Sequence, residues 1–430
     1  MSKCFSILII IVSCLSLSCG NKNAHELNRI VYWASNNTDE ITFARDIVTQ
    51  WNSESPDKNV VFQPVPEGQS SEEVILAAVV GGTTPDIYSN MWQGDVELYA
   101  RAGRLVPFDT IPGFMDFLKT RCDSSVIKEV TSTDGHIYQI PWKINPIMLI
   151  CNDNMFKSFG WHTPPRTYSE FFKAASEIKA SGIVNGYQTK WIGYSEVIVT
   201  WWQRLFDFYP IYLAASGGGS LIKDNKVVFN NKFAVSTFQF LKTLYDNNYF
   251  PRERLSSRQD PFLSSDIAIR FTGPWEIVHA EKFKPKGFEY SFSPLPVPDD
   301  QKSSSVYTYG DTKNIVMFST CKNRIAAWEF IKEMISEKGD FSLLKITNQL
   351  PRRKDLTTNP LFLNYLNNNP KMKPFAEQSK YVKGPDSCPV LKEVFDAISQ
   401  EYEACVIYGK KSPQQAVDDA AKAAEIILLQ

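Results

Sequence analysis

The chain has 430 residues, of which 43% are hydrophobic and 22% charged, a balance typical of folded proteins with enough apolar material for two domains. Its 46 lysines and arginines against 47 aspartates and glutamates give a formal charge of -1, which argues against a nucleic-acid partner. Aromatic residues make up 13% of the chain, and so many flat side chains must either fill cores or line a binding site.

The first residues have the pattern of an export signal. Lys3 precedes the apolar run 5–12, and small residues follow up to Ser18. The apolar stretch is too short to cross a bilayer, so we predict a signal peptide over 1–18 and a polar tether over 19–28.

Cys19 follows this signal and resembles the lipidated cysteine in the lipobox of bacterial lipoproteins, although Ser16 stands where leucine is usual. Cys14 matches the box better but leaves a very short signal, and plain secretion with Cys19 as an ordinary thiol is a further alternative. The resemblance implies an exported protein held at the membrane surface by lipid on Cys19.

Extended apolar runs alternate with helical-period runs from Arg29 onward, which is typical of an α/β protein with largely parallel sheets. The pattern predicts strands at 30–33, 59–65, 147–151, 267–271, 288–292 and 315–318, and a hairpin at 223–226. It predicts helices at 41–52, 70–80, 168–181, 196–213, 232–247 and 324–335.

The residues that usually carry catalysis or hold cofactors are sparse. None of the four histidines has HExxH spacing, and no nucleophile elbow, Walker A loop or dinucleotide-binding glycine motif occurs. The cysteines beyond the signal lack metal-binding spacing, and we expect them to be buried thiols, with one disulfide possible: Cys122, Cys151, Cys321, Cys388 and Cys405. We therefore predict no metal and no cofactor, and the missing motifs are modest evidence against enzymatic activity.

Several segments, in order along the mature chain, resemble the extracellular solute-binding proteins of bacterial ABC importers, the family of maltose-binding protein. They are 31–35, 82–88 with its Pro-Asp pair, 99–109, 136–142, 156–170, 271–275 with its Gly-Pro-Trp motif, 326–330 and 348–352. Cys151 departs from the family pattern, in which this strand position is usually tyrosine.

The resemblance implies an α/β fold of two lobes, the periplasmic-binding-protein fold of class II, with a ligand cleft that closes by hinge motion. The N-terminal lobe would take 29–143 and 293–337, and the C-terminal lobe 144–292 and 338–430. The implied function is capture of a carbohydrate by a monomer and its delivery to a membrane permease.

A sugar site needs aromatic planes for C–H faces and polar groups for hydroxyls. Such residues stand at predicted strand ends, at the crossings between lobes and, by the resemblance, at the sugar-stacking Trp275. The candidates are Trp33, Ser35, Asn36, Trp92, Gln93, Trp142, Lys143, Asn145, Trp201, Trp275, Tyr309, Gly310, Asp311 and Arg352.

Some candidates have equally plain structural explanations. Trp33 could be buried, Lys143 could be a surface charge, and Arg352 could pair with Asp340 or Asp355. Because adjacent helix positions point about 100 degrees apart, only one of Trp201 and Trp202 is expected to face the cleft, with Tyr194, Ser195 and Glu196 as alternatives. Trp51, Trp161 and Trp328 are expected to be structural.

Three other functions remain open at this stage. The same fold could bind glycerol 3-phosphate or another anion, with Lys143 and Arg352 as partners of the phosphate. A secreted glycoside-acting enzyme could assemble a carboxylate pair in space. A lipoprotein could also retain the fold for surface contact alone.

Overall fold

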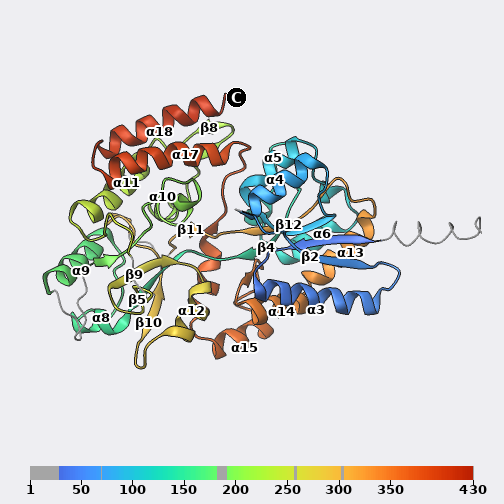
Figure 1. Ribbon diagram of the computed structural model, residues 1–430, viewed down its shortest axis with the longest axis horizontal. Helices are drawn as coiled ribbons and strands as arrows, with labels where there is room; N and C mark the ends of the chain where they lie inside the picture. The colour runs from blue at the N-terminus through green and yellow to red at the C-terminus, as the bar shows by residue number, and fades with distance from the viewer. Residues whose placement is uncertain (1–28, 69, 182–190, 256–258, 302–304, 430) are drawn as a thin grey trace, which may run out of the picture.

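The computed structural model describes residues 29–429 except 69, 182–190, 256–258 and 302–304. The predicted signal peptide, the tether and both candidate lipidated cysteines lie outside the described residues. Two sheets lie side by side, each with helices packed around it, and the C-terminal helices cover the second sheet (Figure 1). Within the described residues, no helix combines the length and apolar character needed to span a membrane.

The first sheet has six strands. Their spatial order is β13 (Leu350–Pro351), β4 (Ile140–Ile144), β12 (Lys313–Met317), β3 (Ile87–Trp92), β1 (Ile30–Ala34) and β2 (Val60–Pro64). A core on one face holds α3 (Thr38–Glu54), α6 (Phe114–Arg121), α13 (Arg324–Met334) and α14 (Glu337–Thr347). The other face packs on α4 (Ser71–Gly81) and α5 (Gln93–Arg101).

The second sheet has four strands, in the order β10 (Tyr290–Ser293), β5 (Met148–Asn152), β9 (Ile267–Thr272) and β6 (Trp191–Gly193). One core contains α8 (Asp153–Ser158), α9 (Tyr168–Ser181), α10 (Phe208–Ser216), α11 (Lys232–Asp246), α17 (Leu391–Tyr402) and α18 (Pro413–Ile427). The opposite core contains residues of α12 (Trp275–Phe283), α15 (Pro360–Asn368) and α16 (Lys373–Gln378).

Short elements join these layers. They are the helix α7 (Ser124–Glu129), the 3-10 turns η1 (Phe108–Thr110), η2 (Trp202–Leu205) and η3 (Ser379–Tyr381), the π-helical turn η4 (Glu403–Ile407), the hairpin β7 (Ile222–Lys223) and β8 (Lys226–Val227), and the parallel pair β11 (Thr308–Tyr309) and β14 (Val382–Lys383). The hairpin predicted at 223–226 is confirmed.

Local signals account for the helices that were predicted well. The helix expected at 168–181 has those bounds, and α4 begins where the Ser70 hydroxyl accepts the Glu73 N–H. Gly82 ends α4 with a φ of 67°, a conformation that suits glycine.

Two predictions about secondary structure were wrong. The sheets are mixed rather than largely parallel, because β5, β9 and β10 pair antiparallel and β12 runs against both β3 and β4. The helix predicted at 196–213 is interrupted: only η2 and α10 form. The buried Asp207 carboxylate pairs with Arg204 at 3.0 Å and accepts the Phe208 N–H, so it caps a new helix.

Three crossing segments meet between the sheets. The Asn145 N–H donates to the Gly310 carbonyl at 2.6 Å, and the Gly310 N–H donates to the Lys383 carbonyl at 3.2 Å. A Cβ atom on Gly310 would lie 2.1 Å from Val382 Cγ1. A glycine at this position therefore lets the segments approach closely.

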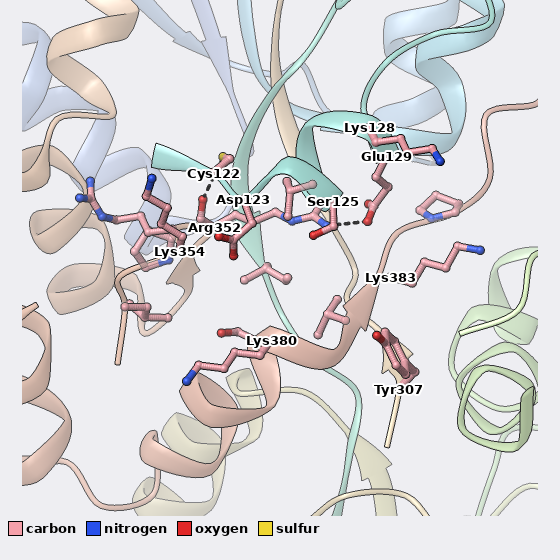
Figure 2. A pocket seen from close by; sticks show the side chains of 18 of the residues that line it. Cys122, Asp123, Ser125, Lys128, Glu129, Tyr307, Arg352, Lys354, Lys380 and Lys383 are labelled. Carbon is pink, nitrogen blue, oxygen red and sulfur yellow. Dashed lines mark hydrogen bonds and ion pairs between the residues drawn. The ribbon is translucent and has the colours of Figure 1, made fainter. Parts of the chain in front are cut away.

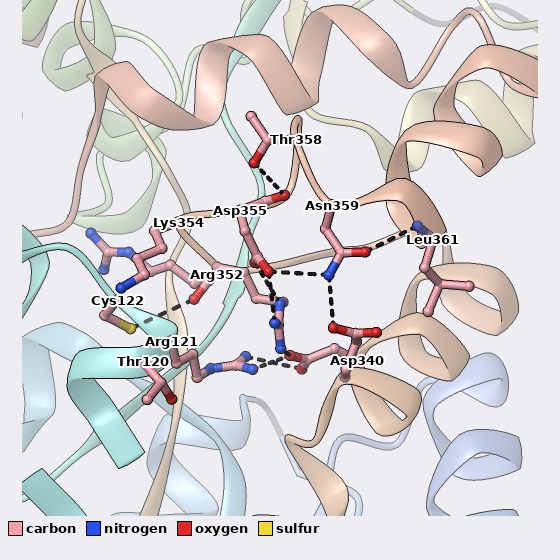
Figure 3. A network of polar contacts seen from close by, with 12 residues as sticks. Thr120, Arg121, Cys122, Asp340, Arg352, Lys354, Asp355, Thr358, Asn359 and Leu361 are labelled. Atoms are coloured by element: carbon pink, nitrogen blue, oxygen red, sulfur yellow. Dashed lines mark hydrogen bonds and ion pairs between the residues drawn. The ribbon is translucent and has the colours of Figure 1, made fainter. Parts of the chain in front are cut away.

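A buried ion-pair network ties α6 and α14 to the chain after β13 (Figure 3). Asp340 is fully buried between Arg121 and Arg353, and Arg353 also pairs with Asp355 at 2.9 Å. Arg352 instead pairs with Glu129, so the alternative in which Arg352 pairs with Asp340 or Asp355 was wrong. α14 also packs on α3.

All five cysteines of the described chain are unpaired and buried, as expected. Burial raises the pKa of Cys321 to about 12 and that of Cys388 and Cys405 to about 11. The thiolate, which is the reactive form, is therefore disfavoured at each of these sites.

We expect the folded protein, in a soluble form beginning at Asn21, to react slowly with a thiol reagent at pH 8. Unfolding in urea should expose all five thiols to rapid labelling. Mass spectrometry of the labelled protein gives the count. Fewer than five labels on the unfolded, unreduced chain would contradict unpaired thiols.

We expect Gly310→Ala to lower the free energy of unfolding by about 1–3 kcal/mol, because the added methyl group overlaps Val382. Urea denaturation measures the change. Gly81→Ala is the matched control, since its nearest neighbour would lie 3.6 Å away at Thr83. Equal stability of the two variants would show that the crossing segments can separate at little cost.

Candidate functional site

A cavity of about 630 Å³ lies where the end of β3 meets η2 and the segment after β11. It is lined by Ser70, Glu72, Glu73, Trp92, Val199, Thr200, Trp201, Trp202, Leu205, Phe206, Asp311, Lys313 and Asp396. Of the predicted site residues, Trp92, Trp201 and Asp311 are brought together here. We refer to it as the aromatic cavity.

Its walls are built from ring contacts between distant parts of the chain. The rings of Trp92 and Trp201 have centroids 4.9 Å apart and planes inclined by 42°. Phe206 meets Trp275 edge-on at 6.2 Å and Tyr309 at 6.3 Å. Trp275 is 41% exposed at the start of α12, so its ring is available beside the cavity.

Charged and polar groups stand beside the rings. The Tyr309 hydroxyl accepts the Trp92 Nε1–H at 3.1 Å and donates to Asp311 at 3.3 Å. Lys313 Nζ lies 3.4 Å from Glu72 and 3.9 Å from Asp311. Carboxylates and an ammonium held in this way can bond the hydroxyls of a ligand lying on the tryptophan faces.

The ionisation of these groups follows from their neighbours. Burial would raise the pKa of Glu72 and lower that of Lys313, but the opposite charges outweigh it. The pKa of Glu72 is therefore lowered and that of Lys313 raised, so both are charged at neutral pH. Burial raises the pKa of Asp396.

Sequence reasoning missed several residues of this site. Lys392 lies over the rings of both Trp92 and Trp201, at 5.6 and 5.2 Å, and pairs with Asp95 at 2.7 Å. Lys392 and Asp396 are four residues apart on α17, a spacing that places them on one helix face. That spacing was readable in the sequence, but the direction in which the face points was not.

Both Trp201 and Trp202 line the cavity, so the expectation that only one of them would face it was wrong. The two residues lie at the start of a short 3-10 turn rather than inside an α-helix. Of their alternatives, Ser195 bonds Asp207 at 3.4 Å, while Tyr194 and Glu196 do not line the cavity.

Three other candidates, Trp142, Lys143 and Asn145, are buried near the crossing segments. Trp142 packs on Phe43, and Asn145 joins the crossing through its backbone. Lys143 is 1% exposed, and its ammonium lies 2.6 Å from Glu40 and 3.1 Å from Asn90. The alternative that Lys143 is a surface charge is therefore wrong.

Gln93 and Gly310 are also enclosed by protein. The Gln93 amide donates to Glu129 at 3.0 Å and to the Pro385 carbonyl at 3.2 Å, and its oxygen accepts the Thr312 hydroxyl at 3.0 Å. The polar atoms of Gln93 therefore hold the crossing segments together.

The remaining candidates lie at other places. At the end of β1, Trp33 is half-buried and bonds Gln63, the Ser35 hydroxyl accepts the Asn37 N–H, and Asn36 is exposed. Arg352 lines a separate cavity of about 400 Å³ (Figure 2). The structural roles expected for Trp51 and Trp328, which are buried in a core, are confirmed, whereas Trp161 is half-buried and lines a third cavity, of about 250 Å³.

One group of the described residues has side chains close enough to share a cation. Ligand atoms of Asp260, Glu276 and His279 lie within 4.8 Å of one another. Arg270 already pairs with Asp260 at 2.8 Å and with Glu276 at 3.3 Å. A guanidinium therefore supplies the positive charge that these carboxylates need.

The comparison with protein families identifies the family of the chain. The model of the bacterial extracellular solute-binding protein family matches residues 34–340. This chain belongs to that family. Its members are exported, and the two-lobed fold described above is the fold of this solute-binding protein's structural neighbours.

Three individual relatives share less than a quarter of their residues with this chain. The solute-binding protein is 24% identical over 309 residues to the maltotriose-binding protein of Pyrococcus abyssi, a match that covers 71% of this chain and 62% of that protein. It is 21% identical over 432 residues to the sn-glycerol-3-phosphate-binding periplasmic protein of Brucella abortus, covering 96% of each. The cyclic alpha-maltosyl-1,6-maltose binding protein of Arthrobacter globiformis has the same fold, with a TM-score of 0.78, 20% identity and coverage of 93% of this chain and 98% of that one.

We expect Lys143→Met to lower the free energy of unfolding by about 3 kcal/mol or more, because it leaves the Glu40 carboxylate buried without its cation. The double variant Glu40→Gln with Lys143→Met should recover most of this loss. Urea denaturation of the single and double variants completes a double-mutant cycle. Additive losses would show that the pair contributes no coupling.

Proposed function

We propose that this solute-binding protein captures a mono- or oligosaccharide in the aromatic cavity and delivers it to the membrane permease of an ABC importer. The observation that carries the proposal is the inclined pair Trp92 and Trp201 beside the charged Glu72, Asp311 and Lys313. Rings of this kind suit the C–H faces of a sugar, and the charged groups suit its hydroxyls.

We further propose distinct roles for the predicted site residues. Trp201, Trp275 and Asp311 contact the sugar, whereas Trp92, which is 2% exposed, packs behind Trp201 and supports its ring. Tyr309 positions Trp92 and Asp311 through its hydroxyl. Gln93, Trp142, Lys143, Asn145 and Gly310 support the crossing between the lobes, while Trp33, Ser35 and Asn36 bound the cleft at the end of β1 and make weaker contacts.

The proposal includes how the protein is held and what it does not do. It is exported and anchored by lipid on Cys19, acts as a monomer, uses no cofactor and performs no chemistry. The bounds expected from the sequence are 29–143 with 293–337 for the first lobe and 144–292 with 338–430 for the second. The packing of α14 on α3 and the pairing of β13 with β4 favour adding these two elements to the first lobe.

A thermal-shift screen of the soluble protein from Asn21 tests the function against mono- and oligosaccharides, polyols and glycerol phosphates. A ligand at 100 times its dissociation constant adds about 2.7 kcal/mol of apparent stability. We expect one sugar class to stabilise the protein and to be recovered unaltered. Cleavage of the sugar would show an enzyme, and stabilisation by glycerol phosphates alone would favour the anion-binding alternative.

We expect Trp275→Ala to weaken sugar binding by about 1–3 kcal/mol without loss of stability, because an exposed stacking ring is removed. Calorimetric titration with the sugar found in the screen measures the change. Phe283→Ala, at the far end of α12 and 58% exposed, is the control and should bind normally. Unchanged affinity in Trp275→Ala would remove this ring from the site.

A further inference from the structure

The cavity of about 400 Å³ that contains Arg352 is separate from the aromatic cavity, and the two share no lining residue. It lies between α7, the segment after β13 and the segment that follows η3 through β14 (Figure 2). This volume is in the range of small-molecule sites.

Positive charge dominates its lining. Six lysines and arginines line it against three acidic residues. Two of the three acids are already engaged. Glu129 accepts the Gln93 amide, the Gly384 N–H and one Arg352 N–H, and Asp386 accepts two backbone N–H groups and pairs with Lys383 at 3.2 Å. Arg353 pairs with Asp340 and Asp355 outside the lining, so among the described residues the cations that no carboxylate balances are Lys128, Lys354 and Lys380.

Arg352 is the most informative group in this lining. Its side chain is 5% exposed, and one N–H, on Nη2, donates to Glu129 at 2.8 Å. Its Nε and Nη1 atoms are buried and meet no acceptor among the described residues. A buried charged donor without acceptors is costly, and an oxyanion beside it would supply them.

The exposed lysines of the lining complete the site. Lys128 on α7 and Lys380 on η3 are exposed and form no ion pair within the described part of the chain. Lys354 donates to the Lys119 carbonyl, which adds no negative charge to offset it. These ammonium groups surround the cavity from different segments, so they attract an anion toward Arg352.

We propose that this cavity is a second binding site, one that takes a small ligand bearing a phosphate group. Arg352 is the buried anchor for the phosphate oxygens, and Lys128 and Lys380 add charge at the rim. The site does not depend on the aromatic cavity, so it stands whether or not the protein carries sugars.

Calorimetric titration of the soluble protein from Asn21 with inorganic phosphate, and separately with glycerol 3-phosphate, tests the site. Sodium chloride keeps the ionic strength constant, because surface charge alone is screened by salt. We expect saturable binding of phosphate by the unaltered protein. Tighter binding of glycerol 3-phosphate would identify a phosphomonoester as the ligand, and weaker binding would identify free phosphate; both outcomes support the site.

The variants separate this site from a general charge effect. Arg352→Gln should weaken phosphate binding by about tenfold or more. The double variant Lys128→Gln with Lys380→Gln should also weaken phosphate binding. Because this variant leaves the Arg352–Glu129 ion pair intact, its weaker binding cannot result from disruption of that pair. Lys286→Gln, an exposed lysine that lines neither cavity, is the control and should bind phosphate normally.

Trp201→Ala should leave phosphate binding unchanged, since Trp201 belongs to the aromatic cavity alone. Loss of phosphate binding in Trp201→Ala would place the anion in the aromatic cavity and overturn the proposal. Absence of phosphate binding by the unaltered protein, or normal binding by both charge variants, would also overturn it.

Discussion

The chain passes between its two sheets along segments that pack so closely that glycine is needed at two of their contacts, and the rest of the structure depends on this packing. Gly310 lies against Val382, and a Cβ on Gly384 would lie 2.5 Å from the Gln93 Oε1 atom. Because these segments are joined by backbone hydrogen bonds, the residues on either side of them are held in register. The aromatic cavity and the cavity that contains Arg352 both include residues of these segments.

On one side of the crossing, Asp311 directly follows Gly310, and Tyr309 directly precedes it. The Tyr309 hydroxyl accepts the Trp92 Nε1–H at the end of β3 and donates to Asp311, so the strand end and the crossing form one hydrogen-bonded unit. Trp201 and Phe206, which pack on the core of the second sheet, contact this unit at Trp92 and Tyr309. A ligand between them would contact both parts of the chain, which is what coupling of binding to lobe closure requires.

Glu129 links the crossing segments to the cavity that contains Arg352. Its carboxylate accepts hydrogen bonds from the side chains of Gln93 and Arg352 and from the Gly384 N–H, which come from three separate stretches of the chain. The buried Asp340 has a comparable position between Arg121 and Arg353. A buried carboxylate such as Asp340 is costly unless it is fully paired, and pairing it fixes the relative positions of the segments that supply the cations.

Much of the fold was accessible from the sequence because it rests on local signals. Helical periodicity, the Ser70 cap and the Gly82 stop place α4, and similar signals place α9. The interruption at Asp207 was not accessible, since it comes from a buried pair with Arg204 and from tertiary packing that overrides helical pattern. Strand direction was equally hidden, because a run of apolar residues is the same in parallel and antiparallel sheets.

For the site, the sequence by itself determined the inventory: the tryptophans, the carboxylates, the glycines at the crossings and the family pattern that relates them. Only the tertiary structure decided which of them meet. It brought Trp92, Trp201 and Asp311 to one cavity, added Glu72 and Lys392 from helix faces whose direction the sequence does not encode locally, and enclosed Lys143 with Glu40. The reason is physical: residue chemistry is local, whereas contact and desolvation depend on segments that are distant along the chain.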